Sequence, residues 1–213
     1  MSKRKIESSE GRSSKPELFS RAVTAIRQGE VIVFPTETFY GLGADALNSA
    51  AVEKVVSLKG RNLENPIAVV IADREMLKEV VAEVPPAALR LMERFWPGPL
   101  TLVLPAKKTL PAPLLNSSGG IGIRISSHPA ATRLARELGR PLTATSANPS
   151  GKEPARTVEE AIGYFSGHVE IFLDGGRLGG TKGSTVVEIV GDRLKIIREG
   201  EIRSQDLEKS LGR

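Results

Sequence analysis

The chain has 213 residues, of which 40% are apolar and 26% are charged, so it can bury a substantial core and falls within the size range of one domain. It contains no cysteine and two histidines, which excludes disulfides and thiolate zinc sites and leaves little for a histidine-based metal site. The longest apolar stretches are too short to span a bilayer, and the first fifteen residues lack the apolar centre of a signal peptide. We therefore expect a soluble, cytoplasmic protein that does not bind membranes.

The formal charge of +5 is concentrated at the N-terminus. Residues 1–15 carry five basic and two acidic groups, which leaves 25 basic against 23 acidic groups, or +2, in the rest of the chain. Short polar termini of this kind are usually disordered, although basic side chains among serines could also touch RNA. We expect a basic, disordered tail over 1–15 and a single domain over 16–213.

The apolar pattern predicts helices and strands that alternate along the chain. Helices are expected over 14–28, 50–58, 74–82, 87–95 and 130–138, with a further helix start at the capping box 157–160; strands are expected over 31–34, 67–72, 100–104, 121–125, 142–145 and 169–173. The segments 186–190 and 194–197 flank a tight turn and predict a hairpin. This order predicts an α/β fold with a mixed sheet.

Four polar segments adjoin these apolar elements: 35–38, 59–61, 145–148 and 182–185. Loops at the ends of strands converge on ligands in α/β sheets, so the four segments could line one crevice. Lys59 and Gly60 on their own are more typical of a helix end, where a cation and a left-handed glycine are both favoured. Arg61 lies beyond that end and needs another partner, which a phosphate would supply.

The polar side chains Thr145, Ser146 and Asn148 precede Pro149, and by themselves they indicate only a turn. If they lie near Lys59, their hydroxyl and amide groups could donate to phosphate oxygens or to a small polar substrate. The segments 59–61 and 145–148 together therefore predict a polyanion pocket.

Familiar catalytic and nucleotide motifs do not fit. The glycine-rich segment 179–185 has its lysine before the glycine and a strand after it, so it is not a Walker loop. The glycines of 41–46 stand too far from the preceding strand for a dinucleotide fold. We find no Ser-His-Asp arrangement, no paired carboxylates and no metal-ligand spacing; His128 most simply caps a helix, and Trp96 is better explained as a packing anchor than as a base-stacking platform.

Together, the motifs resemble the YrdC/TsaC family of L-threonylcarbamoyladenylate synthases. The resemblance is carried, in order and between about residues 21 and 200, by Pro35-Thr-Glu-Thr-Phe-Tyr-Gly-Leu-Gly43, Leu58-Lys-Gly-Arg61, Asn65-Pro66, Trp96-Pro-Gly-Pro-Leu-Thr101, Ile123-Arg124, His128-Pro129 and Thr145-Ser-Ala-Asn148. It implies a twisted mixed parallel and antiparallel sheet with surrounding helices and a concave cationic groove.

The resemblance also implies a reaction. L-threonine, bicarbonate and ATP would give threonylcarbamoyl-adenylate and pyrophosphate, with Mg²⁺ accompanying ATP and no metal held by the protein alone. The product would pass to a threonylcarbamoyl-transferring enzyme that modifies adenosine 37 of tRNA. Two alternatives stay open: an RNA-binding module that uses the cationic groove, and carbamoyl transfer to another substrate.

By positional matching, the resemblance assigns residues to the two substrates. The ATP site would comprise Lys59, Arg61, Asn65, Ser146, Asn148 and Arg198, and the threonine site would comprise Thr38, Arg124, Ala144 and Ser184. Many longer relatives carry a histidine where this chain has Val70, so a threonine contact from that position is missing.

The implied chemistry needs positioning and charge neutralisation more than covalent help. Lys59 and Arg61 would be the catalytic residues that offset charge on the triphosphate, and Arg124 would hold the threonine carboxylate or the carbamate. The sequence points to no general base. We also expect the side chains of Lys59 and Arg61 to be solvent-accessible, so that alanine at either position would reduce pyrophosphate release by orders of magnitude in a folded protein.

Overall fold

The computed structural model describes residues 15–60, 66–191 and 193–212. The expected disordered tail, the start of the first helix at Ser14, and the predicted ATP residues Arg61 and Asn65 therefore lie outside the described residues. In the part of the chain that is described, no helix is long and apolar enough to cross a membrane.

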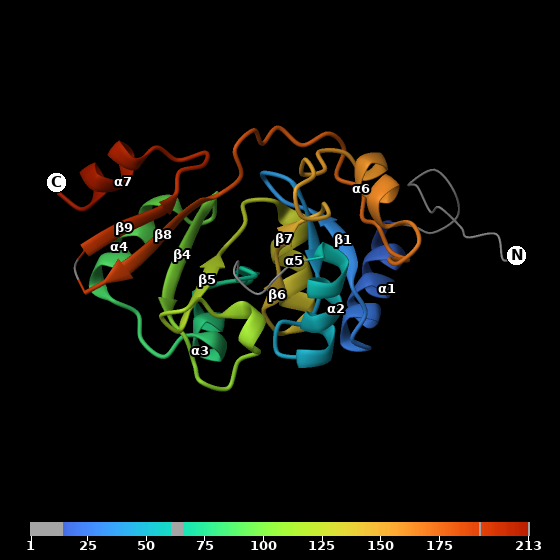
Figure 1. The fold of residues 1–213 in the computed structure, drawn as a ribbon, viewed down its shortest axis with the longest axis horizontal. Helices are drawn as coiled ribbons and strands as arrows, with labels where there is room; N and C mark the ends of the chain where they lie inside the picture. The colour runs from blue at the N-terminus through green and yellow to red at the C-terminus, as the bar shows by residue number, and fades with distance from the viewer. Residues whose placement is uncertain (1–14, 61–65, 192, 213) are drawn as a thin grey trace, which may run out of the picture.

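The described strands form two sheets (Figure 1). The smaller sheet is antiparallel and has the order β1 (Ile32–Pro35), β2 (Tyr40–Gly43), β7 (Thr145–Ser146). The larger has six strands in the order β6 (Leu142–Thr143), β3 (Val69–Val70), β5 (Gly120–Arg124), β4 (Leu100–Pro105), β8 (Thr185–Val190), β9 (Arg193–Arg198). Because β3 pairs with β5 and β4 with β8 in parallel while the other pairs are antiparallel, this sheet is mixed, as predicted.

Helices cover both faces of the smaller sheet. Successive side chains of a strand point to opposite faces, and β1 is apolar at every position, so both faces need to be buried. Ile32 and Phe34 pack with α1 (Lys15–Arg27) and α5 (Pro129–Leu138). Val31, just before β1, and Val33 belong to the main core, to which α2 (Ser49–Lys59) and α6 (Val158–Phe165) also contribute. The smaller sheet is thus internal except at Ser146, which is half-buried.

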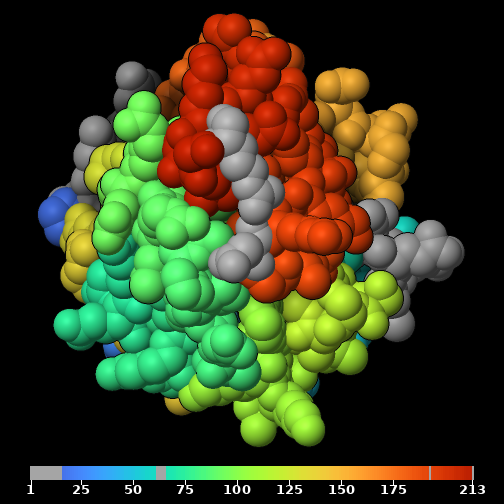
Figure 2. Space-filling model, turned by 90° about the vertical axis from the view of Figure 1, so that its left-hand side faces the viewer, coloured from blue at the N-terminus to red at the C-terminus, as the bar shows by residue number. Residues whose placement is uncertain are grey.

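One face of the larger sheet packs on α4 (Pro86–Phe95), whose buried Ala88 and Leu91 join the same core as Leu102 and Ile123. At that end α4 packs against α7 (Ser204–Ser210), and Figure 2 shows the green α4 region beside the red C-terminal elements. Two short 3₁₀ turns, Arg74–Met76 and Ala112–Leu114, and α3 (Leu77–Val80) complete the described elements. The opposite face carries the polar side chains of Thr101 and Arg124, which alternate with the buried apolar residues.

Several sequence expectations differ from the structure. The predicted strand 67–72 is reduced to the two residues of β3, and the predicted helix 74–82 is a 3₁₀ turn followed by α3. The predicted strand 142–145 is two short strands in different sheets, so it joins the sheets instead of extending one. The predicted strand 169–173 is wrong in extent, because only Phe172 bridges to Val33, and Pro35 leaves β1 without a further donor. The apolar pattern predicts no strand at β2, where glycines weaken the signal. In the structure the Phe34 ring packs directly over Gly41 and Gly43, and a Cβ at Gly43 would lie 2.8 Å from that ring.

The helix start predicted at 157–160 is present as a full capping box and gives a stability prediction. The Thr157 side chain accepts from the Glu160 amide, and the Glu160 carboxylate accepts from the Thr157 amide. We expect Thr157→Ala to lower the free energy of unfolding by about 1 kcal/mol, measured by urea denaturation. Thr24→Ala, on the exposed face of α1, is the control and should lower it little; equal losses in the two variants would contradict the capping role.

Candidate functional site

Lys59 is buried, with 1% of its surface exposed, although it is the last residue of α2. Its ammonium donates to the carbonyl oxygens of Ser146 (2.7 Å) and Asn148 (2.6 Å) and to the Asn148 side-chain oxygen (3.0 Å), with the Ser146 hydroxyl at 3.5 Å. A lysine ammonium has three protons, and these four oxygens share them. The expectation that Lys59 is solvent-accessible is wrong, because the ammonium lies under the loop 146–148.

The same contacts bring two of the predicted polar segments together. Asn148 also donates to the carbonyl oxygens of Pro149 (3.1 Å) and Lys152 (2.6 Å), and the Ser146 hydroxyl donates to the Asn148 side-chain oxygen (2.6 Å). Gly60 adopts the left-handed conformation (φ 61°) that the helix-end interpretation predicted. The end of α2 is therefore both a helix cap and the anchor of the loop after β7.

That loop is hydrogen-bonded to β2, which follows the turn after β1. The amide of Ala147 donates to the Tyr40 carbonyl (2.7 Å), and Ser146 pairs with Gly41. Two residues before Tyr40, the buried Thr38 contacts the Thr36 hydroxyl, which closes the turn by donating to the Phe39 carbonyl (2.7 Å). Thr38, next to Glu37 in the chain, therefore lies two residues before the strand that pairs with the Ser146 loop.

Arg124 ends β5 and forms a buried ion pair with Glu37, in which Nε lies 3.3 Å from Oε1. The exposed fractions of the two side chains are 7% and 11%. Within the described residues, neither of these two atoms has a hydrogen-bond partner, whereas Glu37 Oε2 accepts from the Ser126 hydroxyl. The facing Glu37 carboxylate lowers the free-energy cost of burying the Arg124 charge.

The other end of the Arg124 guanidinium reaches Ser184, at the start of β8. Arg124 Nη1 lies 3.4 Å from the Ser184 hydroxyl, and Thr101 donates to the same oxygen (2.9 Å). Arg198, in the edge strand β9, donates through Nη2 to the Ser184 carbonyl (2.8 Å) and hydroxyl (3.3 Å). Three strands of the larger sheet thus direct donors to one buried serine.

The segment 174–184 crosses from the smaller sheet to β8 and passes over the turn after β1 (Figure 1). Tyr40 fixes it at one end, since its hydroxyl donates to the Gly176 carbonyl (2.8 Å) and accepts from the Gly175 amide (2.9 Å). Burial raises the pKa of Tyr40 to about 12, so the hydroxyl keeps its proton. A Cβ on Gly180 would collide with the Thr38 backbone, so this close approach requires glycine.

The two other possibilities to check are a catalytic role for His128 and a metal site. His128 caps α5 as predicted, with its Nδ1 accepting from the Ala130 amide (3.2 Å), and burial lowers its pKa while the nearby Glu37 opposes that shift. Within the described ranges, no group of three or more histidine, cysteine or acidic residues could hold a metal ion.

The structure places eight of the ten predicted site residues, and each has a contact that ties it to the others or to the sheet beneath them. Ala144 bridges the two sheets through its amide, which donates to the Ala68 carbonyl (2.8 Å). Val70 is fully buried in the cluster that includes Phe34 and Leu142, so it presents no group to a substrate. Sequence reasoning missed Glu37 and Thr101 as polar members of the site, although both lie inside motifs that carried the resemblance.

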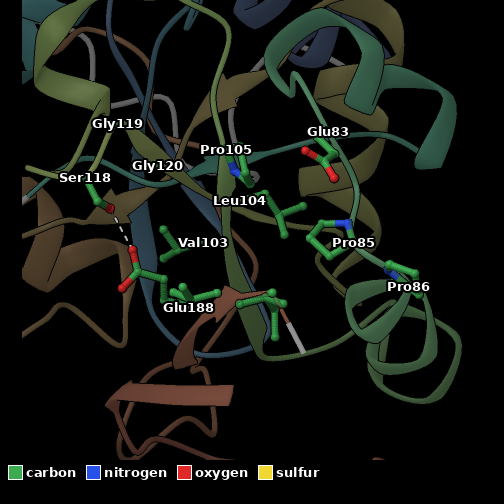
Figure 3. Close-up of a pocket in the computed structure, with 13 residues that line it drawn as sticks. Glu83, Pro85, Pro86, Val103, Leu104, Pro105, Ser118, Gly119, Gly120 and Glu188 are labelled. Carbon is green, nitrogen blue, oxygen red and sulfur yellow. Dashed lines mark hydrogen bonds between the residues drawn. The ribbon is translucent and has the colours of Figure 1, made fainter. Parts of the chain in front are cut away.

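A hollow of about 550 Å³ lies at the opposite end of the larger sheet (Figure 3). It is lined by the ends of β4 and β8 and the start of β5, including Val103, Gly120 and Glu188, whereas the predicted residues lie at the start of β4 and β8 and the end of β5. Ser118 holds the Glu188 carboxylate (2.7 Å), and this hydrogen bond is the main reason that the pKa of Glu188 is lowered. This hollow is therefore separate from the predicted site.

Comparison with known proteins identifies the family of the chain. A family model named Sua5/YciO/YrdC, described as "Telomere recombination", matches residues 24–200. The chain belongs to the Sua5/YciO/YrdC family. It is 40% identical over 194 residues to a threonylcarbamoyl-AMP synthase of Bacillus subtilis (91% of this chain, 56% of the relative) and 37% identical over 187 residues to that of Pyrococcus abyssi (88% and 55%).

A solved structure of the same Sua5/YciO/YrdC type superposes closely. The structure of P. abyssi Sua5 complexed with L-threonine gives a TM-score of 0.88 at 36% identity, over 95% of this chain and 59% of the other. This chain thus spans between half and two thirds of the length of these relatives.

The burial of Lys59 predicts a structural cost for its removal. Lys59→Met keeps the side-chain length but leaves two buried carbonyl oxygens without their donor, so we expect the free energy of unfolding to fall by about 2 kcal/mol or more. Lys78→Met, at an exposed position of α3, should change it by about 0.5 kcal/mol at most. Chemical denaturation of both variants measures the difference, and equal stability would show that the Lys59 contacts contribute nothing.

Proposed function

We propose that this chain makes threonylcarbamoyl-adenylate from L-threonine, bicarbonate and ATP and releases pyrophosphate. The observation that carries the proposal is the way contacts and chain neighbours link the two predicted sets of residues. Lys59 donates to Ser146, whose strand pairs with β2 directly after the turn that holds Thr38. In the same turn Glu37 pairs with Arg124, which reaches Ser184. The relatives named threonylcarbamoyl-AMP synthase and the threonine complex of P. abyssi Sua5 support the same activity.

The proposed division of labour differs from the sequence expectation in one respect. Lys59 acts on ATP through the loop it anchors, because its protons are shared by the oxygens of Ser146 and Asn148. Ser146, Asn148 and Arg198 are proposed to line the ATP side, with Arg61 and Asn65 contributing as the motifs predict. A loop held this firmly keeps its groups in place during phosphoryl transfer, which favours catalysis by positioning.

On the threonine side, Thr38, Arg124, Ala144 and Ser184 are the proposed contacts. Arg124 is suited to a carboxylate or carbamate, because its charge is buried and its guanidinium is held at both ends. Since Val70 is buried among apolar side chains, threonine would be held without a polar group from that position.

The remaining proposals concern partners. Mg²⁺ would enter with ATP, coordinated by phosphate oxygens and water, because Mg²⁺ commonly binds through substrate phosphates. The product would be consumed by an enzyme that transfers the threonylcarbamoyl group to adenosine 37 of tRNA, and the concave cationic groove would hold the substrates. A cytoplasmic location and a single catalytic domain over 16–213 complete the proposal.

Pyrophosphate release is the direct test. The purified chain is incubated with ATP in decarbonated buffer, and threonine and bicarbonate are each omitted in turn while the adenylate is followed by mass spectrometry. We expect pyrophosphate and threonylcarbamoyl-adenylate in equal amounts, only when both are present. Ser146→Ala removes the hydroxyl that holds the Asn148 side chain, and it should reduce the rate about 100-fold by misplacing the proposed ATP loop.

Two results would contradict the proposal. Pyrophosphate release that ignores threonine would indicate another acceptor, such as the carbamoyl-transfer alternative. Salt-dependent tRNA binding with no ATP consumption would favour an RNA-binding module instead. Ser118→Ala, at the far end of the larger sheet, is the matched control and should keep the parent rate.

A further inference from the structure

Exposed apolar side chains gather at one end of the molecule. Among the described residues, three large apolar side chains stand exposed: Leu89 in α4 (43%), Val190 in β8 (59%) and Ile197 in β9 (49%). Their elements lie at the end that Figure 2 turns towards the viewer, with α4 in green and the β8–β9 hairpin in red. Single exposed apolar residues are ordinary, but a group of them on neighbouring elements marks a candidate contact surface. We call these three residues and the hollow of Figure 3 the end surface.

The hollow connects two of these exposed side chains. Val190 lines it together with Pro85 and Pro86 at the start of α4 (Figure 3). Leu89 lies one turn after Pro86 and therefore on the same face of the helix. The walls between the helix and the strand are largely apolar, so Leu89 and Val190 belong to one surface that is hollowed in the middle.

The charges that line the hollow are negative. Glu83 and Glu188 are its charged lining residues, and within the described part of the chain no lysine, arginine or histidine lines it. Glu188 is buried and accepts from the mostly exposed Lys195 at 3.3 Å. The Glu83 side chain is exposed and has no ion pair or hydrogen bond among the described residues. The hollow therefore offers an unpaired carboxylate beside apolar walls, which suits a cationic group on an apolar stem.

An unpaired cation lies next to Val190. Arg193 is the residue that pairs with Val190 across the β8–β9 hairpin, and side chains opposite each other in an antiparallel pair lie on the same face. The Arg193 side chain is exposed, and across the described ranges it has no ion pair or hydrogen bond. Arg193 and Glu83 are thus both neighbours of the same exposed valine, and they do not pair with each other in one chain.

A two-fold arrangement of two chains satisfies both charges. In a symmetric dimer, residue i of one copy contacts residue j of the other, and j contacts i in return. A surface that carries an unpaired cation and an unpaired anion beside one apolar side chain is complementary to itself in this sense. A basic partner protein would leave Arg193 unpaired, and an acidic one would leave Glu83 unpaired. A second copy of this chain pairs both.

We propose that the end surface pairs two copies of this chain about a two-fold axis that passes near Val190. The Arg193 side chain of each copy enters the hollow of the other and pairs with Glu83 there, while Leu89 and Val190 are covered. The residues of the proposed active site lie at the opposite end of the larger sheet, so the dimer leaves that site open. The inference does not rest on the proposed function, and association is measured without substrates.

Sedimentation velocity of the purified chain over about 1 to 100 µM measures the association. We expect the mass to rise with concentration from 22.8 kDa towards twice that value. Val190→Asp places a carboxylate at the proposed axis, where the two copies would repel each other, and should weaken dimerisation about tenfold or more. Thr24→Asp adds the same charge on the exposed face of α1, at the other end of the molecule, and should leave dimerisation unchanged (Figure 1).

Charge reversal tests which residues meet across the axis. Arg193→Glu and Glu83→Arg should each weaken dimerisation about tenfold or more, because like charges then face each other in both halves of the interface. An equal mixture of the two variants should form mixed dimers. In a mixed dimer the reversed residue of one copy faces the reversed residue of the other, and the second contact is that of the parent protein. A fluorescent label on one variant detects these dimers.

Each outcome bears on the inference. Mixed dimers from the two charge variants support it, and their absence, with both variants folded by circular dichroism, overturns it. A parent chain that stays monomeric over this range also overturns it. So does a dimer that both Val190→Asp and Arg193→Glu leave intact, since its interface lies elsewhere. If Val190→Asp does not fold, the charge variants still decide the question, because Glu83 and Arg193 are both exposed.

Discussion

The burial of one ammonium group sets the arrangement of the site. Lys59 closes α2 and donates into the loop after β7, so the two segments cannot move apart without leaving buried carbonyl oxygens unpaired. That loop in turn pairs with β2, which directly follows the turn that carries Glu37 and Thr38. The interaction that looks like an ordinary helix cap in the sequence therefore fixes the position of groups more than eighty residues away along the chain.

The larger sheet supplies the other residues of the site through the register of its strands. Its strands β4, β5 and β8 bring Thr101, Arg124 and Ser184 to one end, and the ion pair with Glu37 connects that end to the smaller sheet. The short segment 142–146 belongs to both sheets, so it holds the two halves in register. Substrates that react with each other can then be held by elements whose relative position is fixed by backbone pairing.

Several elements of this structure could be predicted from local sequence. Helix ends such as Gly60 and the Thr157 capping box, and the buried run of β1, follow from propensity and pattern. The strand β2 was not readable, because its glycines are explained only by the Phe34 ring above them. The burial of Lys59 and the role of Glu37 depend on partners far along the chain, and no local pattern distinguishes a solvated cation from one enclosed by a distant loop.

The most direct test of this account is nuclear magnetic resonance of ¹⁵N-labelled lysine side chains. If the Lys59 ammonium is enclosed by the loop, its protons exchange slowly with water and give a resolved signal at neutral pH, which disappears in Lys59→Met and moves little when ATP is added. A Lys59 signal that is lost to fast exchange without nucleotide, and appears or shifts strongly on ATP binding, would show instead that the ammonium is free to grip phosphate.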